Sequence, residues 1–206
     1  MNTHSKIAVD VVLLPPNDVI DKIIAINEQA ATKNLSWGSL GKDDFLPHLS
    51  LAMGCVEHDS LETVKSVVEA VASKFAPMTI ELFELYYAEM PNDAKMYCLR
   101  AKNIPELQQL HENLINELQQ HFSYDCTKES LFSKPGEDVK EPDYINKFYS
   151  SYSFEAFDPH VTLRIKEEVG KDALPITFTA NEVAACHVGI MTTCRKNLFE
   201  VQMGAK

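Results

Sequence analysis

The chain has 206 residues, of which 45% are hydrophobic and 24% charged, and its formal net charge is −11. This is the composition of an ordinary globular protein, and the acidic balance argues against a broad surface that tracks the phosphates of long nucleic acid. No apolar run approaches the roughly 18 residues of a membrane span. The five cysteines are scattered without a CxxC pair, so we expect reduced thiols in a cytoplasmic protein and no zinc site or disulfide framework.

The first half of the chain alternates strand-like and helix-like segments. A β-rich run over residues 7–14, interrupted by Asp10, ends at a double proline. Apolar residues at helical spacing predict one helix that starts just after these prolines and fades near residue 32, and a second helix up to residue 75. The strands expected in this half are residues 7–14, 48–56, 78–89 and 95–102.

The second half begins with an amphipathic helix over residues 105–122, whose proline suits the first helical turn. Residues 123–158 follow as a polar stretch that is rich in aromatic side chains. The stretch is too long for a structureless loop, so we expect an ordered insertion with a short helix around residues 143–149. Its aromatic residues are expected to pack on the rest of the fold or to form a lid that stacks a base. The strands expected in this half are residues 160–166, 176–191 and 197–203.

The two halves echo each other. In each half a helix precedes a strand that starts with a histidine, and a connection and a pair of strands follow. We therefore predict an α+β fold, a single bilobal domain over residues 1–206 whose similar lobes are the approximate halves 1–103 and 104–206. Each lobe is expected to have an antiparallel sheet with helices packed outside, and a pseudo-twofold cleft is expected between the lobes.

Two short strings mark the histidine strands. Each consists of a proline, a histidine, an apolar residue, a hydroxyl residue and another apolar residue: Pro47-His48-Leu49-Ser50-Leu51 and Pro159-His160-Val161-Thr162-Leu163. Composition alone makes two such strings improbable. Because side chains alternate along a strand, His48 shares a face with Ser50, and His160 shares a face with Thr162 and Arg164. One such polar face is usually a solvated sheet surface, but two matching faces in matching half-chains indicate a shared site.

Paired histidines with nearby hydroxyls suit the chemistry of a phosphodiester. One neutral histidine can take a proton from the attacking water or hydroxyl, and the other can give a proton to the leaving alkoxide. The hydroxyls of Ser50 and Thr162 can donate to the non-bridging phosphate oxygens. Arg164 is a candidate phosphate ligand, with a surface ion pair as the alternative. This chemistry needs no metal or other cofactor, and the residues do not say which histidine is the acid.

The paired strings resemble the His-x-Ser/Thr-x motifs of the 2H phosphoesterase superfamily, which includes bacterial 2′–5′ RNA ligase/cyclic phosphodiesterase proteins. The resemblance covers essentially the whole chain. It implies a metal-independent hydrolase that opens 2′,3′-cyclic or related phosphodiesters of nucleotides or RNA ends. His48 and His160 would be catalytic, and Ser50, Thr162 and Arg164 would bind the phosphate.

Two alternatives remain open beside hydrolysis. One is 2′–5′ RNA ligation, and the other is a nucleotide-binding module that has the same fold but no catalytic activity. The expected partner is a nucleotide or short RNA end, without a membrane or an extended nucleic-acid surface, and we expect a monomer. The other histidines, His111 and His187 among them, lack the hydroxyl partner and are expected at the surface or on helix faces.

Overall fold

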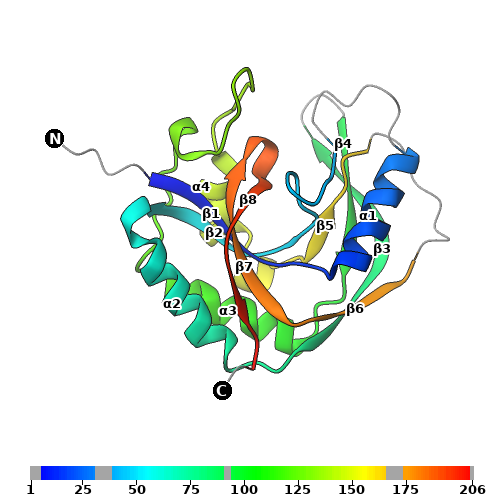
Figure 1. Cartoon of the computed structure of the whole chain (residues 1–206), viewed down its shortest axis with the longest axis horizontal. Coiled ribbons are helices and arrows are strands. Elements are labelled where there is room, and N and C mark those ends of the chain that lie inside the picture. Colours follow the sequence, from blue (N-terminus) through cyan, green and yellow to red (C-terminus); the bar gives the residue numbers. More distant parts are fainter. Residues whose placement is uncertain (1–5, 31–38, 91–93, 166–173, 205–206) are drawn as a thin grey trace.

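The computed structural model describes residues 6–30, 39–90, 94–165 and 174–204. Within these ranges it forms two four-stranded antiparallel sheets with helices against them, which confirms the predicted α+β bilobal class (Figure 1). The strands are β1 (Lys6–Leu13), β2 (Leu49–Glu57), β3 (Met78–Met90), β4 (Ala94–Ala101), β5 (His160–Thr162), β6 (Ile176–Ala180), β7 (Glu182–Gly189) and β8 (Thr193–Gln202).

The helices lie close to the predicted ranges because their apolar spacing matches a helix that buries one side. In α3, for example, Pro105 occupies the first turn, and a stripe that includes Leu107 and Leu114 is fully buried. No described helix is long and apolar enough to span a membrane. The helices are α1 (Asn17–Ala30), α2 (Leu61–Ala72), α3 (Pro105–Leu118) and α4 (Asp143–Ser151), with 3-10 turns η1 (His58–Ser60), η3 (Lys128–Ser130), η4 (Phe154–Ala156) and η6 (Ile190–Thr192).

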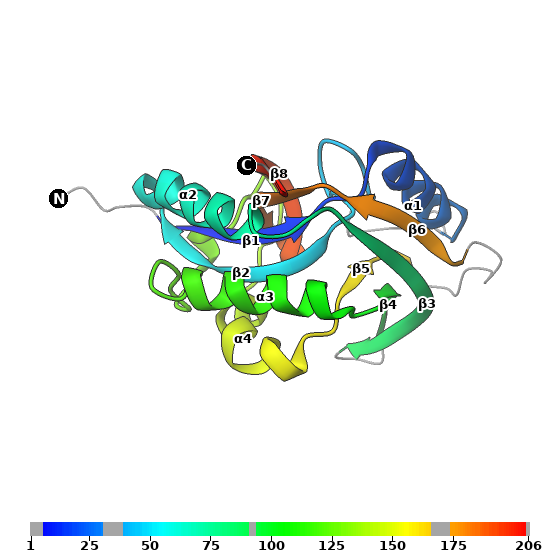
Figure 2. The same ribbon diagram turned by 90° about the horizontal axis from the view of Figure 1, so that it is seen from below.

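The two sheets interlace the halves of the chain. The first sheet has the strand order β2-β1-β7-β8 and the second sheet has the order β5-β4-β3-β6, so each takes two strands from either half. Helices α2 and α3 contact each other and cover the first sheet, while α1 lies beside the second (Figure 2). This differs from the expectation that each half of the chain forms its own lobe. The repeated unit is strand, helix and histidine strand, as β1–α1–β2 and β4–α3–β5, and it leaves each histidine strand at a sheet edge.

The predicted strand over residues 176–191 is two strands that belong to different sheets. β6 pairs with β3 in the second sheet and β7 pairs with β1 in the first, and Asn181 alone separates them. The prediction was wrong here because no glycine or proline marks the break. This short connection carries the chain directly from one sheet to the other.

The second histidine strand is also shorter than predicted. β5 ends at Thr162, and residue 166, where the predicted strand ends, lies outside the described residues. The N–H of Leu163 still donates to Tyr97 O at 2.8 Å, but the N–H of Arg164 donates to the side-chain oxygen of Asn27 on α1 at 2.6 Å. The side chain of Asn27 therefore takes the place of the next strand partner of Arg164, and the ladder between β4 and β5 ends before this residue.

Four of the five cysteines form disulfides, which corrects the expectation of reduced thiols. Cys55 is joined to Cys126 and Cys186 to Cys194, while Cys98 is a buried free thiol. Sequence spacing did not reveal the first pair because it forms only where the start of the insertion lies against β2. Disulfides are typical of oxidising compartments. The cytoplasmic location stays a prediction, and these bonds do not favour it.

The insertion over residues 123–158 is ordered, as expected, and includes η3, α4 and η4. His111 lies beneath it on a face of α3, the second of the two expected positions, and is fully buried. Its Nδ1 donates to Leu51 O at 2.6 Å, its Nε2 accepts from the Phe154 N–H at 2.9 Å, and its ring stacks on Phe157 with centroids 3.9 Å apart. His111 thus joins β2, α3 and the insertion.

Candidate functional site

The two histidine rings are held by the same local contact. His48 Nδ1 donates to Leu46 O at 2.6 Å, and His160 Nδ1 donates to Asp158 O at 2.8 Å. In both cases the acceptor lies two residues before the histidine, and the residue between them is a proline, whose ring fixes the backbone φ angle. Because Nδ1 carries the donated proton, Nε2 is the nitrogen left for proton transfer.

The structure brings the two histidine strands together although they belong to different sheets. β2 and β5 contact each other at the sheet edges (Figure 1). Burial lowers the pKa of His48, and the charge of His160 lowers it further, so the two rings lie within electrostatic range. We call His48, Ser50 and Asp10 the first half-site, and His160, Thr162 and Cys98 the second half-site.

The first half-site is buried and contains a carboxyl group. The side chain of His48 is 12% exposed, and burial is the main cause that lowers its pKa to about 4. The Asp10 side chain, from β1, is only 1% exposed; its Oδ2 lies 2.7 Å from Ser50 Oγ and 3.5 Å from His48 Nε2. Burial raises the pKa of Asp10 well above its ordinary value, opposed by the hydrogen bond with Ser50. The raised pKa of Asp10 and the lowered pKa of His48 both favour the uncharged form of these side chains at pH 7.

His160 in the second half-site is partly exposed and is supported by charged residues at the surface. The ring of Tyr86 lies edge-on to His160 with centroids 6.1 Å apart, and its hydroxyl donates to Asp158 at 3.2 Å. The guanidinium of Arg100 lies 3.9 Å from the centroid of the Tyr86 ring and donates from Nε to Asp158 at 3.0 Å. These contacts fix the segment whose carbonyl orients His160.

Thr162 has a thiol as its neighbour where Ser50 has a carboxyl. Cys98 lies opposite Thr162 in the ladder between β4 and β5, and its Sγ is 3.9 Å from Thr162 Oγ1. Burial raises the pKa of Cys98 to about 11, so the thiol keeps its proton at pH 7. The Cys98 thiol can therefore act as a weak donor to the Thr162 hydroxyl.

Arg164 lies beyond the end of β5, so the strand alternation that placed it beside His160 does not extend to it. It is 5% exposed, and its guanidinium lies 4.6 Å from the centroid of the Phe45 ring. Burial and the nearby charge of Arg195 lower the pKa of Arg164 to about 10. Its contact with a phosphate stays a prediction, and its burial weighs against a direct contact.

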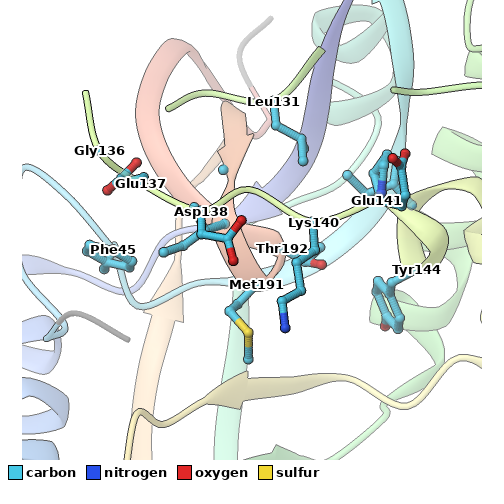
Figure 3. A pocket seen from close by; sticks show the side chains of 14 residues that line it. Phe45, Leu131, Gly136, Glu137, Asp138, Lys140, Glu141, Tyr144, Met191 and Thr192 are labelled. Carbon is cyan, nitrogen blue, oxygen red and sulfur yellow. The ribbon is translucent and has the colours of Figure 1, made fainter. Parts of the chain in front are cut away.

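A cavity of about 670 Å³ reaches from Phe45, in the loop before His48, to the insertion, and neither His48 nor His160 lines it. Residues of the insertion and η6 form its walls, and Phe45 and Tyr144 lie at opposite ends with Lys140 and Met191 between them (Figure 3). Burial raises the pKa of Tyr144, and the charge of Asp10 raises it further. Tyr144 therefore connects its end of the cavity electrostatically with Asp10 of the first half-site. Phe45 and Tyr144 make the lining of the cavity partly aromatic.

Sequence reasoning missed Asp10, Tyr144 and Arg195. Asp10 gave a signal, since it interrupts an apolar strand, but its partner Ser50 was not visible. Arg195 is 2% exposed and is bonded to Asp44 and Glu137, with 2.7 Å between its Nη2 and Glu137 Oε1. These partners come from the loop before β2 and from the insertion, so no local pattern predicts the cluster. Among the described residues, no three His, Cys, Asp or Glu side chains are arranged to bind a metal ion.

The two-lobed fold with paired histidine strands is that of the 2H phosphoesterase superfamily. Residues 42–187 match the model of the 2′-5′ RNA ligase superfamily, and the chain belongs to this family, as the paired strings predicted. No curated protein sequence matches the chain.

Solved structures with a similar fold cover nearly all of the chain. Escherichia coli LigT complexed with 3′-AMP is 14% identical with a TM-score of 0.59, covering 97% of this chain and 99% of that one. LigT complexed with ATP is 13% identical with a TM-score of 0.59, covering 98% and 99%. A protein of Thermus thermophilus is 15% identical with a TM-score of 0.56, covering 97% and 100%. These likenesses show the fold.

Proposed function

We propose that this protein is a metal-independent phosphoesterase that opens 2′,3′-cyclic phosphodiesters of nucleotides or RNA ends. The observation that carries the proposal is the contact shared by His48 and His160, because it occupies Nδ1 of each ring and leaves the same nitrogen, Nε2, for proton transfer. Membership of the family supports phosphoester chemistry. The LigT structures complexed with 3′-AMP and ATP support a nucleotide as the ligand.

His48 acts as the general base and His160 as the general acid in this proposal. The low pKa of His48, about 4, keeps its Nε2 unprotonated at pH 7, which suits the base, and the role of the acid is assigned to the other ring, His160. His48 removes a proton from water, and the water oxygen bonds to phosphorus. The bond from phosphorus to one ribose oxygen breaks, and His160 protonates that oxygen. The product is a 2′- or 3′-phosphomonoester.

Ser50 and Thr162 bind the non-bridging phosphate oxygens through their hydroxyls, which stabilises the charge of the transition state. We assign the nucleoside to the neighbouring cavity between Phe45 and Tyr144, where an aromatic ring can stack. The insertion then forms one wall of the binding site. The net charge of −11 favours a nucleotide or a short RNA end over an extended nucleic-acid surface, and we propose a monomer.

The test is a product assay on the four 2′,3′-cyclic nucleotides, a short RNA with a 2′,3′-cyclic end and a linear diester, each with and without chelator. We expect the cyclic substrates to give one phosphomonoester at a rate that chelator does not change. A double variant, H48A with H160A, serves as the control for a contaminating activity. Absence of turnover by the wild type, or full turnover by the double variant, would overturn the proposal.

RNA ligation is the second candidate, and the family to which the chain belongs is the observation that favours it. It is the same ring opening with a different nucleophile: a 5′-hydroxyl in place of water attacks the 2′,3′-cyclic phosphate, the bond from phosphorus to the 3′-oxygen breaks, that oxygen is protonated, and a 2′–5′ bond forms. The assay mixes two RNA halves that carry these ends and follows the joined product as salt is raised. A joined product with salt-sensitive yield would favour ligation, whereas tight binding of 3′-AMP without any product would indicate a non-catalytic module.

A further inference from the structure

Asp10 is a fully buried carboxyl in a strand that has neighbours on both sides. It pairs with Met53 of β2 and with Cys186 of β7 in the first sheet. Its Oδ2 contacts Ser50 Oγ at 2.7 Å, and its Oδ1 has no hydrogen-bond partner among the described residues. A buried carboxylate normally needs several donors or a cation to offset the lost hydration, so a carboxyl with one hydroxyl neighbour takes up a proton instead.

No cation near Asp10 offsets a negative charge there within the described part of the chain. His48 is the nearest basic group, and its lowered pKa keeps it neutral at pH 7. On η3, which packs against β1, Lys128 pairs with Glu141 at 3.3 Å and Glu129 accepts from Thr127. The elements packed around Asp10 carry further titratable side chains: His48 just before β2 and Glu57 at its end, Glu182 and His187 of β7, Lys128 and Glu129 of η3, and Asp143, Tyr144, Lys147 and Tyr149 of α4.

The direction of the bond between Asp10 and Ser50 decides what Ser50 can do. A serine hydroxyl has one proton. If Asp10 is ionised, Ser50 donates that proton to Asp10 and presents only lone pairs to a phosphate. If Asp10 is protonated, it donates to Ser50 Oγ, and the Ser50 proton is available to the phosphate. Thr162 has no such conflict, because its neighbour Cys98 is itself a donor.

We infer that Asp10 is a positioning residue that acts as a carboxylic acid and donates its proton to Ser50, so that Ser50 donates to the substrate phosphate. The inference rests on the proposed function, since it concerns the same phosphate. The chain of donors runs from Asp10 Oδ2 to Ser50 Oγ and then to a non-bridging oxygen. Protonation also removes a negative charge that would otherwise repel the phosphate. The electrostatics of Asp10 described above agree with this geometry.

The experiment compares D10N, D10A and S50A by KM and kcat for a 2′,3′-cyclic nucleotide at pH 7. In D10N the amide nitrogen donates to Ser50 Oγ, and the amide oxygen takes the place of Oδ1, which has no partner to lose. We expect D10N to keep KM within about twofold of wild type. S50A should raise KM about tenfold, the cost of a lost hydrogen bond to a charged group. D10A leaves the Ser50 hydroxyl without its positioning donor and should raise KM about threefold, and the double variant D10A with S50A should be no worse than S50A.

A spectroscopic readout separates this role from a purely structural one. The infrared difference spectrum of wild type minus D10N at pH 7 should contain the C=O band of a protonated carboxyl. D125N is the matched control, because Asp125 is 67% exposed and pairs with Lys6 outside the site. We expect D125N to leave KM and that band unchanged. Thermal melting checks that each variant is folded.

Three results would overturn the inference: D10N raises KM as much as S50A, folded D10A leaves KM unchanged, or the carboxyl band is missing. Any of these with an active wild type leaves the proposed function standing. A wild type that turns over no cyclic phosphate would overturn both proposals, so the two failures are distinguishable.

Discussion

The first and second half-sites share a motif and a backbone contact but differ in their surroundings. In both, a carbonyl two residues before the histidine accepts from Nδ1. His48 is nearly buried and has Asp10 beside it, whereas His160 is partly exposed and lies among the exposed charges of Arg100 and Asp158. The comparison shows that a repeated motif fixes ring orientation, while burial in the first half-site favours the neutral form of His48.

Removing either histidine should have the largest effect. In H48A and in H160A we expect kcat to fall about 10²–10⁴-fold, the usual range for a lost general acid or base. The double variant should be little worse than the more damaged single variant, because residues that act as one unit are not additive. Steady-state kinetics with a 2′,3′-cyclic nucleotide measures this, with circular dichroism as the check on folding. Full activity in either single variant would contradict the assignment.

The pH dependence should separate the two half-sites. Burial lowers the pKa of His48 to about 4, so a neutral base is available at every pH above that value. We expect the acidic limb of kcat/KM, which reports the free enzyme, to have its midpoint near pH 4 and not near the ordinary histidine value of about 6.5. Initial rates measured from pH 3.5 to 8, with folding checked at each pH, test this. A midpoint near 6.5 would mean that His48 is not the base.

The buried support of the first half-site should matter for stability. His111 bonds to Leu51 O and the Phe154 N–H without exposure to solvent, so H111A should lower the free energy of unfolding by about 2–4 kcal/mol. Urea denaturation measures the change. H58A is the matched control, since the side chain of His58 is 64% exposed, and we expect it to change stability by less than about 0.5 kcal/mol.

His111 should also make the free energy of unfolding depend on pH. Burial lowers the pKa of His111 in the folded state, so between that pKa and about 6.5 the unfolded chain binds the extra proton. Its contribution to stability is therefore complete above about pH 6.5 and is lost as the pH falls toward the folded pKa. We expect H111A to lose less stability than wild type between pH 7 and pH 5. Equal losses in the two proteins would contradict this.

The exposed support of the second half-site should have the smallest effect. Arg100 is 34% exposed and pairs with Asp158 and Glu84, which are also exposed, so R100A should cost less than about 1 kcal/mol of stability. His160 keeps its backbone acceptor in this variant, so we expect only a slight change in kcat/KM. Thermal melting and kinetics alongside H111A measure the contrast. A loss from R100A as large as that from H111A would remove the distinction between the two supports.

The sequence was sufficient for features that depend on local pattern. Helical spacing located α2 and α3, the length and aromatic content of residues 123–158 predicted an ordered insertion, and the two proline–histidine strings led to one family. Each of these signals lies within a short stretch of chain. Side-chain alternation can be applied only as far as a strand continues, and β5 ends at Thr162, before Arg164.

The remaining features depend on contacts between distant residues. The chain passes from the second sheet to the first at Asn181, an ordinary polar residue with no glycine or proline beside it. The pairing of Cys55 with Cys126 and the bond between Asp10 and Ser50 each join segments that only the tertiary fold brings together. A charged residue inside an apolar strand is a signal that something compensates it, but the sequence does not name the partner.

The interlaced sheets have a consequence for synthesis on the ribosome. The first sheet, whose edge strand β2 begins just after His48, is complete only when β7 and β8 have joined β1 and β2, and β8 extends to Gln202. A growing chain can therefore pair β1 with β2 early, yet it leaves one edge of β1 open until the final strands emerge. Nascent chains are most exposed to mispairing during this interval, and a polypeptide cut short before β8 retains both histidine strings without the sheet that supports the first.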